Sequence, residues 1–238
     1  MTALRLMTVV LAILFSSVGI TIAADTPAPS EVEKAIQAYA AKLEADAFAA
    51  AGKTAKARAA DILRHPGTPV LGNANGDITI VTFFDYQCPF CKANEPRILQ
   101  LLKDDPKVRF VTKDFPILGP ASIVAAKAAL ASVRQGKHEA LHNAMMAYRG
   151  KLDDGIIFTL AESAGLDVAR LKADMTAPEI ADQLLANMNL ARALKISVVP
   201  GYIVEDKVLS GLSNKTETAK INFADEVAQA RARKAQAP

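Results

Sequence analysis

The sequence predicts an α/β fold in which a helical region is inserted into a sheet-forming domain, with a helical extension ahead of that domain. A β-branched and aromatic run at 77–84 is followed by a helix-compatible segment and a second such run at 108–112, which is the order of a β-α-β unit. Between 121 and 194, apolar residues recur every three or four positions, as in helices. Two short β runs then follow at 201–204 and 208–209.

Composition sets limits on the class of protein. Of the 238 residues, 51% are hydrophobic, which is enough to bury a sizeable core. The formal net charge is only +3, and no basic run is interleaved with aromatic residues, so nucleic acid is not expected as a partner. A final helix is expected at 216–234.

Residues 1–24 are predicted to be a cleavable signal peptide. Arg5 precedes an apolar run at 6–15, and Ala23 and Ala24 are small residues suited to a cleavage site. The alternative is an uncleaved membrane anchor, but the apolar run is shorter than the ~20 residues that a spanning helix needs. We therefore expect a soluble protein that acts outside the cytoplasm.

Residues 25–64 are expected to form a helical segment. Ser30 and Glu33 have the spacing of a capping box. The first helix is expected to end near Gly52, and a second at 54–64 leads into a Pro- and Gly-rich linker. An apolar stripe in the first helix consists of Val32, Ile36, Tyr39 and Leu43. This stripe packs either on the rest of the chain or on copies of itself, and we favour self-association.

Both cysteines, Cys88 and Cys91, lie in "FFDYQCPFCK", where the first predicted strand meets the first predicted helix. A structural disulfide between them would close almost the smallest possible loop and would stabilise the fold little. A structural zinc site needs about four ligands, and beyond this single Cys-x-x-Cys the chain offers only His65, His138 and His142. The position and spacing favour a reactive dithiol.

The local physics assigns different roles to the two sulfurs. At the start of a helix, unpaired N–H groups and the helix dipole favour a thiolate, which predicts Cys88 as the nucleophile. Pro89 suits the first helical position, where its missing N–H costs nothing. Cys91 lies about one turn later and is predicted to resolve the mixed disulfide formed at Cys88. Because the electrons reside on sulfur, no organic cofactor is expected.

The chain resembles the DsbA-like thiol:disulfide oxidoreductases of the thioredoxin fold. The resemblance rests on "FFDYQCPFCK", on "KDFPILGPAS" at 113–122, on the helical region that follows and on Pro200, and it covers roughly residues 30–235. It is greatest to the ScsC-type branch, whose members often carry an N-terminal helical segment before a segment like "PVLGN" at 69–73. The resemblance implies a periplasmic enzyme, a protein disulfide oxidase or isomerase.

The same resemblance implies a domain organisation. The thioredoxin fold would be formed by 65–116, which carries the two cysteines, together with 196–238, which carries the cis-proline loop and the last helix. The inserted helical domain would span 117–195.

The resemblance also implies a substrate site and partners. Pro200 should follow a cis peptide bond and face the dithiol, with Val199 lending backbone contacts to a bound client. Apolar surface at Phe90, Val199 and Pro200 would receive unfolded or misfolded protein substrates. A membrane redox partner would reset the dithiol, and a homotrimer through residues 30–64 would match the trimers that some ScsC-like proteins form.

Three departures from the family pattern affect these expectations. Thr82 stands where members commonly have a buried acid that helps to move protons, and Asp85, which is nearer to the cysteines, is interpreted as a surface or capping carboxylate. Phe90 stands where the strongest oxidants have a histidine, which implies a weaker oxidising tendency. The segment "SVVPGY" lacks the common Gly-Thr-Pro pattern, so substrate preference stays open.

Two further patterns point to metals. The stretch "HEALH" at 138–142 matches the zinc-protease pattern, with Glu162 as a candidate third ligand, but a turn intervenes and a packing helix is the favoured interpretation. His142, Met145 and Met146 have a spacing that would suit copper(I), although core packing is more usual for such methionines. The alternative function is therefore a periplasmic copper- or soft-metal-binding stress protein that uses Cys88 and Cys91 as ligands.

Overall fold

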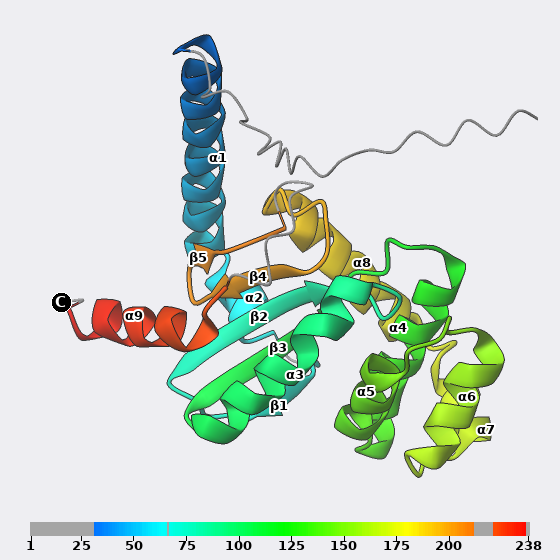
Figure 1. Ribbon diagram of the computed structural model, residues 1–238. Helices are drawn as coiled ribbons and strands as arrows, with labels where there is room; N and C mark the ends of the chain where they lie inside the picture. Colours follow the sequence, from blue (N-terminus) through cyan, green and yellow to red (C-terminus); the bar gives the residue numbers. More distant parts are fainter. Residues whose placement is uncertain (1–30, 66, 212–220, 237–238) are drawn as a thin grey trace, which may run out of the picture. The chain divides into compact units, whose positions relative to one another are not determined.

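The structure is a computed structural model that describes residues 31–65, 67–211 and 221–236 (Figure 1). The predicted signal peptide and Ser30 of the predicted capping box lie outside these residues. The chain divides into two compact units, residues 1–40 and residues 41–238. The described part of the first unit is the beginning of a single helix, and the second unit contains the sheet and the cysteines.

The second unit is built on a five-stranded mixed sheet with the strand order β1-β3-β2-β4-β5. The strands are β1 (Val70–Gly72), β2 (Ile78–Phe84), β3 (Val108–Asp114), β4 (Gly201–Val204) and β5 (Lys207–Val208). Strands β2 and β3 are parallel, and the remaining pairs are antiparallel. Every residue of β2 and β3 is buried, as expected for central strands covered on both faces.

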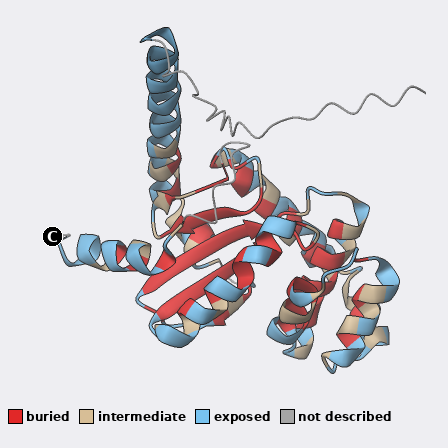
Figure 2. Ribbon diagram, in the orientation of Figure 1, coloured by how far each residue is buried: buried red, intermediate tan, exposed pale blue. Residues whose placement is uncertain are grey.

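Helices cover both faces of this sheet (Figure 1). The helices are α1 (Glu31–Ala57), α2 (Ala59–Leu63), α3 (Pro89–Asp104), α4 (Pro120–Ser132), α5 (His138–Ala147), α6 (Asp154–Ser163), α7 (Val168–Asp174), α8 (Pro178–Ala193) and α9 (Phe223–Ala235). Buried side chains of α3 and α9 pack against Ile80, Phe110 and Tyr202 on one face of the sheet. On the other face, Val81 and Phe83 join a larger core formed with α2 and the inserted helices α4 to α8. Figure 2 shows the strands buried between these layers.

The expected linker at 65–77 contains a strand that the sequence did not predict. Strand β1 pairs antiparallel with β3, with Leu71 opposite Phe110. Three residues are too few for an alternating pattern to be recognised, and the strand forms because the edge of β3 offers free backbone partners. Helix α7 lies within the region 121–194 that was predicted to be helical.

The predicted end of the first helix is wrong. Helix α1 continues through Gly52 to Ala57. A Cβ atom on Gly52 would lie 3.2 Å from the Asp206 carbonyl oxygen, so this glycine lets the β4–β5 turn approach the helix and does not end it. The last helix begins at Phe223, capped by the Asn222 side chain, whereas the expected start at residue 216 lies outside the described residues.

Candidate active site

Cys88 occupies the N-cap of helix α3. Its backbone is extended, with φ −74° and ψ 116°, and Pro89 follows at the first helical position, as predicted. The Cys88 sulfur accepts a hydrogen bond from the Cys91 backbone N–H at 3.3 Å and lies 3.6 Å from the Val199 carbonyl oxygen. Both cysteines are buried, and no disulfide joins them in this structure. The strand-to-helix turn thus holds a thiol at a helix start, beside a loop more than a hundred residues away in the chain.

The surroundings of the two thiols make them differ in acidity. The Cys91 thiol donates to the Cys88 sulfur, and the backbone N–H groups of Cys91 and Phe90 add to this, so the pKa of Cys88 falls to about 7 although burial and Asp85 oppose the shift. Burial, followed by the interactions with Cys88, raises the pKa of Cys91 well above its usual value. At neutral pH the charge therefore resides on Cys88, and Cys91 keeps its proton.

The peptide bond between Val199 and Pro200 is cis, which confirms the prediction for this loop. Strand β4 begins directly after it, and Gly201 pairs with Phe83 of β2, five residues before Cys88. This register explains why the Val199 carbonyl reaches the Cys88 sulfur, since the end of β2 lies next to the start of the antiparallel strand β4.

The predicted substrate-binding residues differ in exposure. Phe90 is 55% exposed on the first turn of α3, whereas Val199 is 7% exposed and Pro200 is buried. The loop before α4 adds exposed apolar side chains at Ile117 and Leu118. The Leu118 backbone N–H is bonded to Asp85, three residues before Cys88, which fixes this loop beside the dithiol.

Asp85 is buried, so the surface alternative for this residue is wrong. Its two carboxylate oxygens accept from the backbone N–H groups of Gln87 at 2.8 Å and Leu118 at 2.9 Å. It therefore caps the turn into the active-site helix and ties that turn to the next loop. Thr82 is buried in β2, so a hydroxyl side chain occupies the position where family members commonly have a buried acid.

Two buried acids near the site were not predicted from the sequence. Asp114 ends β3, and neither of its carboxylate oxygens has a hydrogen-bond partner among the described residues. Burial raises the pKa of Asp114 to about 8. Glu95 lies on α3 and is bonded to His142 of α5. The only sequence signal for Glu95 was its position four residues after Cys91, on the same helix face.

The residues that suggested a metal site are engaged in packing. His138 and His142 are stacked with ring centroids 5.6 Å apart, and both ring nitrogens of His142 are bonded, to Tyr86 and to Glu95. Met145 and Met146 are buried in the core, as the packing interpretation expected. Within the described ranges, no group of three or more His, Cys, Asp or Glu side chains could hold a metal ion.

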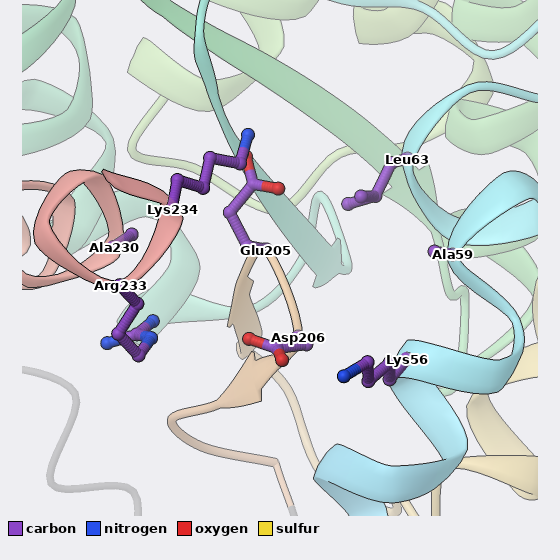
Figure 3. Close-up of a pocket in the computed structure, with 8 residues that line it drawn as sticks. All are labelled: Lys56, Ala59, Leu63, Glu205, Asp206, Ala230, Arg233 and Lys234. Carbon is purple, nitrogen blue, oxygen red and sulfur yellow. The ribbon is translucent and has the colours of Figure 1, made fainter. Parts of the chain in front are cut away.

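A cavity of about 370 Å³ lies away from the dithiol, next to the β4–β5 turn (Figure 3). Its lining residues are Lys56, Ala59, Leu63, Glu205, Asp206, Ala230, Arg233 and Lys234. The Glu205 carboxylate is already bonded to Lys234 at 3.0 Å and to the Thr79 backbone N–H at 2.6 Å. Glu205 thus joins α9 to the sheet.

Known proteins share this fold and this site region. Residues 79–220 match the family described as the DSBA-like thioredoxin domain. A thioredoxin-like oxidoreductase from Silicibacter pomeroyi DSS-3 is 39% identical, with a TM-score of 0.67 over 73% of this chain and 97% of that chain. The thiol-disulfide exchange protein alpha-DsbA2 from Wolbachia pipientis is 28% identical, with a TM-score of 0.65 over 74% and 95%. The catalytic domain of Proteus mirabilis ScsC shares the fold, with a TM-score of 0.66 at 22% identity over 76% and 98%.

Curated relatives include membrane antiporters that are much longer than this chain. The match to Na(+)/H(+) antiporter NhaA 3 from Salinispora tropica is 27% identical and covers 58% of this chain but only 22% of the antiporter. Disulfide bond formation protein D from Bacillus subtilis is 26% identical over 63% of this chain and 73% of that protein. The fold is thus thioredoxin-like with a helical insertion, as predicted, and ScsC is among its structural neighbours. The relatives of this chain thus include a thiol-disulfide exchange protein and a disulfide bond formation protein. The chain belongs to the DSBA-like thioredoxin domain family.

Proposed function

We propose that the protein is a periplasmic thiol:disulfide oxidoreductase that exchanges disulfides with protein clients through Cys88 and Cys91, as an oxidase or an isomerase. The observation that carries this proposal is the Cys88 sulfur at the start of α3, 3.3 Å from the Cys91 N–H and 3.6 Å from the Val199 carbonyl oxygen. A helix N-terminus stabilises the thiolate that attacks a disulfide. The second thiol, one turn away, is close enough to displace what the first one captures.

The exchange consists of two sulfur displacements. The Cys88 thiolate attacks a client disulfide and forms a mixed disulfide, and one client sulfur leaves as a thiolate. Cys91 then attacks the Cys88 sulfur, the client is released, and the Cys88–Cys91 disulfide forms. In the oxidising direction the same steps run in reverse, and a client dithiol becomes a disulfide. A membrane redox partner would then reset the protein to its starting state.

Clients would lie across the apolar surface that surrounds the dithiol. Phe90 is exposed on the first turn of α3, and Leu118 is exposed in the loop that is bonded to Asp85. Both can cover apolar side chains of an unfolded client. Val199 and Pro200 would contribute backbone contacts, because their side chains are buried.

The pKa of Cys88 favours a protein that is only moderately oxidising over a strong oxidant. A pKa of about 7 leaves about half of Cys88 as thiolate at neutral pH, which suits a protein that attacks and rearranges client disulfides. The strongest oxidants of this chemistry have thiol pKa values of about 3.5. The value agrees with the weaker oxidising tendency expected from Phe90.

The proposal includes export to the periplasm and assembly into a homotrimer. The charged and apolar pattern of residues 1–24 supports export by a cleavable signal peptide. Among the described residues, no helix is both long and apolar enough to cross a membrane. The exposed stripe of α1 supports a homotrimer through residues 30–64, with side chains exposed at Val32, Ile36, Tyr39 and Leu43.

Substitution of each cysteine tests the exchange. The wild-type protein should reduce insulin and restore activity to scrambled ribonuclease, and Cys88→Ser should do neither. Cys91→Ser should accumulate a mixed disulfide with the client, which non-reducing gel electrophoresis detects. Full activity in Cys88→Ser would contradict the proposal.

Redox titration of the dithiol against glutathione decides the direction of electron flow. A potential close to that of known isomerases, about −180 mV, together with rescue of scrambled ribonuclease, would assign isomerase activity. A clearly higher potential with rapid oxidation of reduced client would assign oxidase activity.

A further inference from the structure

A polar cavity of about 240 Å³ lies between the segment of α2, strand β3 and helix α8. Arg58, Asp61 and His65 line it from the α2 segment, Lys113 lines it from β3, and Asn187 lines it from α8. The volume is several times the roughly 30 Å³ that one water molecule occupies in the liquid. The cavity therefore has room for a small molecule, and its described lining includes neither cysteine of the dithiol.

Lys113 brings a buried ammonium group to the wall of this cavity. The residue is only 1% exposed, and Nζ donates to the Asp61 carbonyl oxygen at 3.0 Å and to the Thr68 hydroxyl at 3.1 Å. Both acceptors are neutral, whereas an ammonium group has three N–H donors and a full charge. In the part of the chain that the structure describes, Lys113 forms no ion pair with a carboxylate and its third donor has no acceptor. Buried charges in proteins are normally paired.

The charges around Lys113 leave an excess of positive charge. The Asp61 carboxylate accepts from Arg58 at 2.9 Å, so these two charges offset each other. Arg109, on the same strand as Lys113, is also buried and donates to the carbonyl oxygen of Leu63 at the end of α2. A helix C-terminus supplies at most about half a negative charge. It cannot neutralise two buried cations.

Other lining groups can also donate hydrogen bonds into the cavity. His65 Nδ1 is buried and has no hydrogen-bond partner among the described residues. A ring nitrogen of histidine donates when it carries the hydrogen. The side-chain amide of Asn189 on α8 lines the cavity as well, and it has two N–H donors. The lining thus suits a ligand that accepts hydrogen bonds.

Lys113 keeps its charge at neutral pH in spite of burial. Burial lowers the pKa of Lys113 to about 8, while Asp61 opposes this shift and Arg109 adds to it. About nine in ten Lys113 side chains are therefore protonated at pH 7. An anion beside the ammonium group would favour the charged form further.

We propose that this cavity is a binding site for a small oxyanion, a carboxylate or an inorganic phosphate, and that Lys113 is its main contact. The oxyanion accepts the third N–H of Lys113 and supplies the counter-charge that the described residues lack. It also joins α2, β3 and α8, which pack in one core. Because the ligand binds the folded chain, it stabilises that chain in proportion to the logarithm of its concentration.

Thermal unfolding of the full-length protein tests the site. Sodium acetate or sodium phosphate replaces sodium chloride at constant ionic strength and pH 7, and circular dichroism follows the melting. Above the dissociation constant, each tenfold rise in oxyanion concentration should raise the melting temperature of the wild-type protein by about 4 °C. A response to acetate assigns a carboxylate ligand, and a response to phosphate alone assigns a phosphate ligand.

Lys113→Met removes the ammonium group while keeping a long side chain, and it should abolish the response. Its matched control is Lys103→Met, which removes an exposed ammonium group from α3 on the other face of the sheet. General salt effects on stability act on every variant alike. They are therefore removed by comparing the two.

Ala186→Glu provides a second test that does not depend on a buried position. Ala186 is exposed on α8 and lines the cavity, so a glutamate there supplies its own carboxylate in place of the ligand. This variant should lose the response to added oxyanion. Ala181→Glu adds the same charge to an exposed position of α8 outside the cavity lining and should respond as the wild type does.

The outcome is decided by the responses to oxyanion. Loss in Ala186→Glu and in folded Lys113→Met, with retention in both controls, supports the site, and Ala186→Glu decides alone if Lys113→Met does not fold. A wild-type protein that melts equally in chloride and in both oxyanions would overturn the inference, because water alone would then satisfy Lys113. A response that persists in either test variant, or that is lost in the controls, would overturn it too.

Discussion

Cys88 and Cys91 differ in acidity because of a few neighbouring atoms. The helix start directs two backbone N–H groups and the Cys91 thiol at the Cys88 sulfur, whereas Cys91 is buried behind it. Hydrogen bonds to the charged form lower a pKa, and burial without such bonds raises it. The division of labour between the two thiols is thus a property of their positions on one helical turn.

The thiol of Cys91 should be the largest single contribution to the acidity of Cys88. Cys91→Ala removes this donor, whereas Cys91→Ser keeps a hydroxyl in its place. We expect the Cys88 pKa to be higher in the alanine variant than in the serine variant by about one unit. The pH dependence of alkylation by iodoacetamide measures both values. Identical midpoints would show that the backbone N–H groups alone set the acidity.

Asp114 should make the stability of the protein depend on pH. Its pKa is raised from 3.8 to about 8, because burial favours the neutral acid. The stability that this proton contributes is fully present below about pH 4 and is lost as the pH rises through about 8. Asp114→Asn should therefore match wild type near pH 4 and exceed it near pH 8 by on the order of a few kcal/mol.

Urea denaturation at the two pH values measures this difference. Thr112→Ser, in the same strand, serves as a control that leaves the titration of Asp114 intact. A stability difference between Asp114→Asn and wild type that does not change with pH would show that the carboxyl is not held neutral in the folded protein.

At the scale of secondary-structure elements, the inserted helices are attached to the active-site turn by residues that flank the cysteines. Gln87 exchanges two hydrogen bonds with the backbone of Leu152, at 2.6 and 3.2 Å. Lys92 donates to the Tyr148 carbonyl oxygen at 2.7 Å. The helical insertion therefore supports the geometry of the dithiol, in addition to covering one face of the sheet.

Helix α1 combines a packed end with an exposed end. Ala51 and Ala55 are buried in the core, whereas the apolar stripe earlier in the helix is exposed. A deletion of residues 25–64 would consequently remove core residues, including Ile62, together with the stripe. Substitutions confined to the stripe give a cleaner test of self-association.

Glutamates in the stripe should convert an oligomer into a monomer, because they place charge where apolar side chains would be buried. The test variant combines Val32→Glu, Ile36→Glu and Tyr39→Glu. A control with the same added charge, away from the stripe, combines Gln37→Glu, Ala38→Glu and Ala41→Glu. Light scattering should give a monomer mass for the first variant and the wild-type mass for the second. An unchanged mass in the stripe variant would end the proposal of a trimer through this helix.

At the scale of the whole molecule, several dithiols in one assembly would act on one client together. Binding at a second point becomes intramolecular once the first is engaged, which raises the effective concentration of the second dithiol. Rearrangement of a misfolded client gains from this, because it needs repeated attacks on the same chain. Reduction of a small disulfide needs one dithiol only.

The stripe variant should therefore lose isomerase activity and keep simple exchange. We expect rescue of scrambled ribonuclease to fall at least about tenfold per dithiol. Reduction of a small-molecule disulfide should stay within about twofold of wild type, since the environment of Cys88 is unchanged. Parallel loss of both activities would indicate damage to the active site, and loss of neither would show that each dithiol acts alone.

Features that depend on neighbours along the chain could be predicted from the amino-acid sequence. The pattern at 77–84 predicted β2, the Cys-x-x-Cys at its end predicted a thiol at a helix start, and the apolar spacing from 121 to 194 predicted the helical insertion. The family resemblance added the cis bond at Pro200. Each of these rests on short-range periodicity, on backbone preferences or on a recognised motif, and these are visible without a fold.

The distant groups that surround the dithiol could not be predicted in this way, because the packing of the fold brings them together. This packing placed the Val199 carbonyl oxygen beside Cys88 and His142 beside Glu95, and it buried Asp114 where the part of the chain that the structure describes gives its carboxylate no hydrogen-bond partner. Strand β1 and the continuation of α1 through Gly52 were likewise settled by contacts with β3 and with the β4–β5 turn. The physical reason is that burial and hydrogen bonding between elements depend on how the chain packs, and no local pattern encodes that packing.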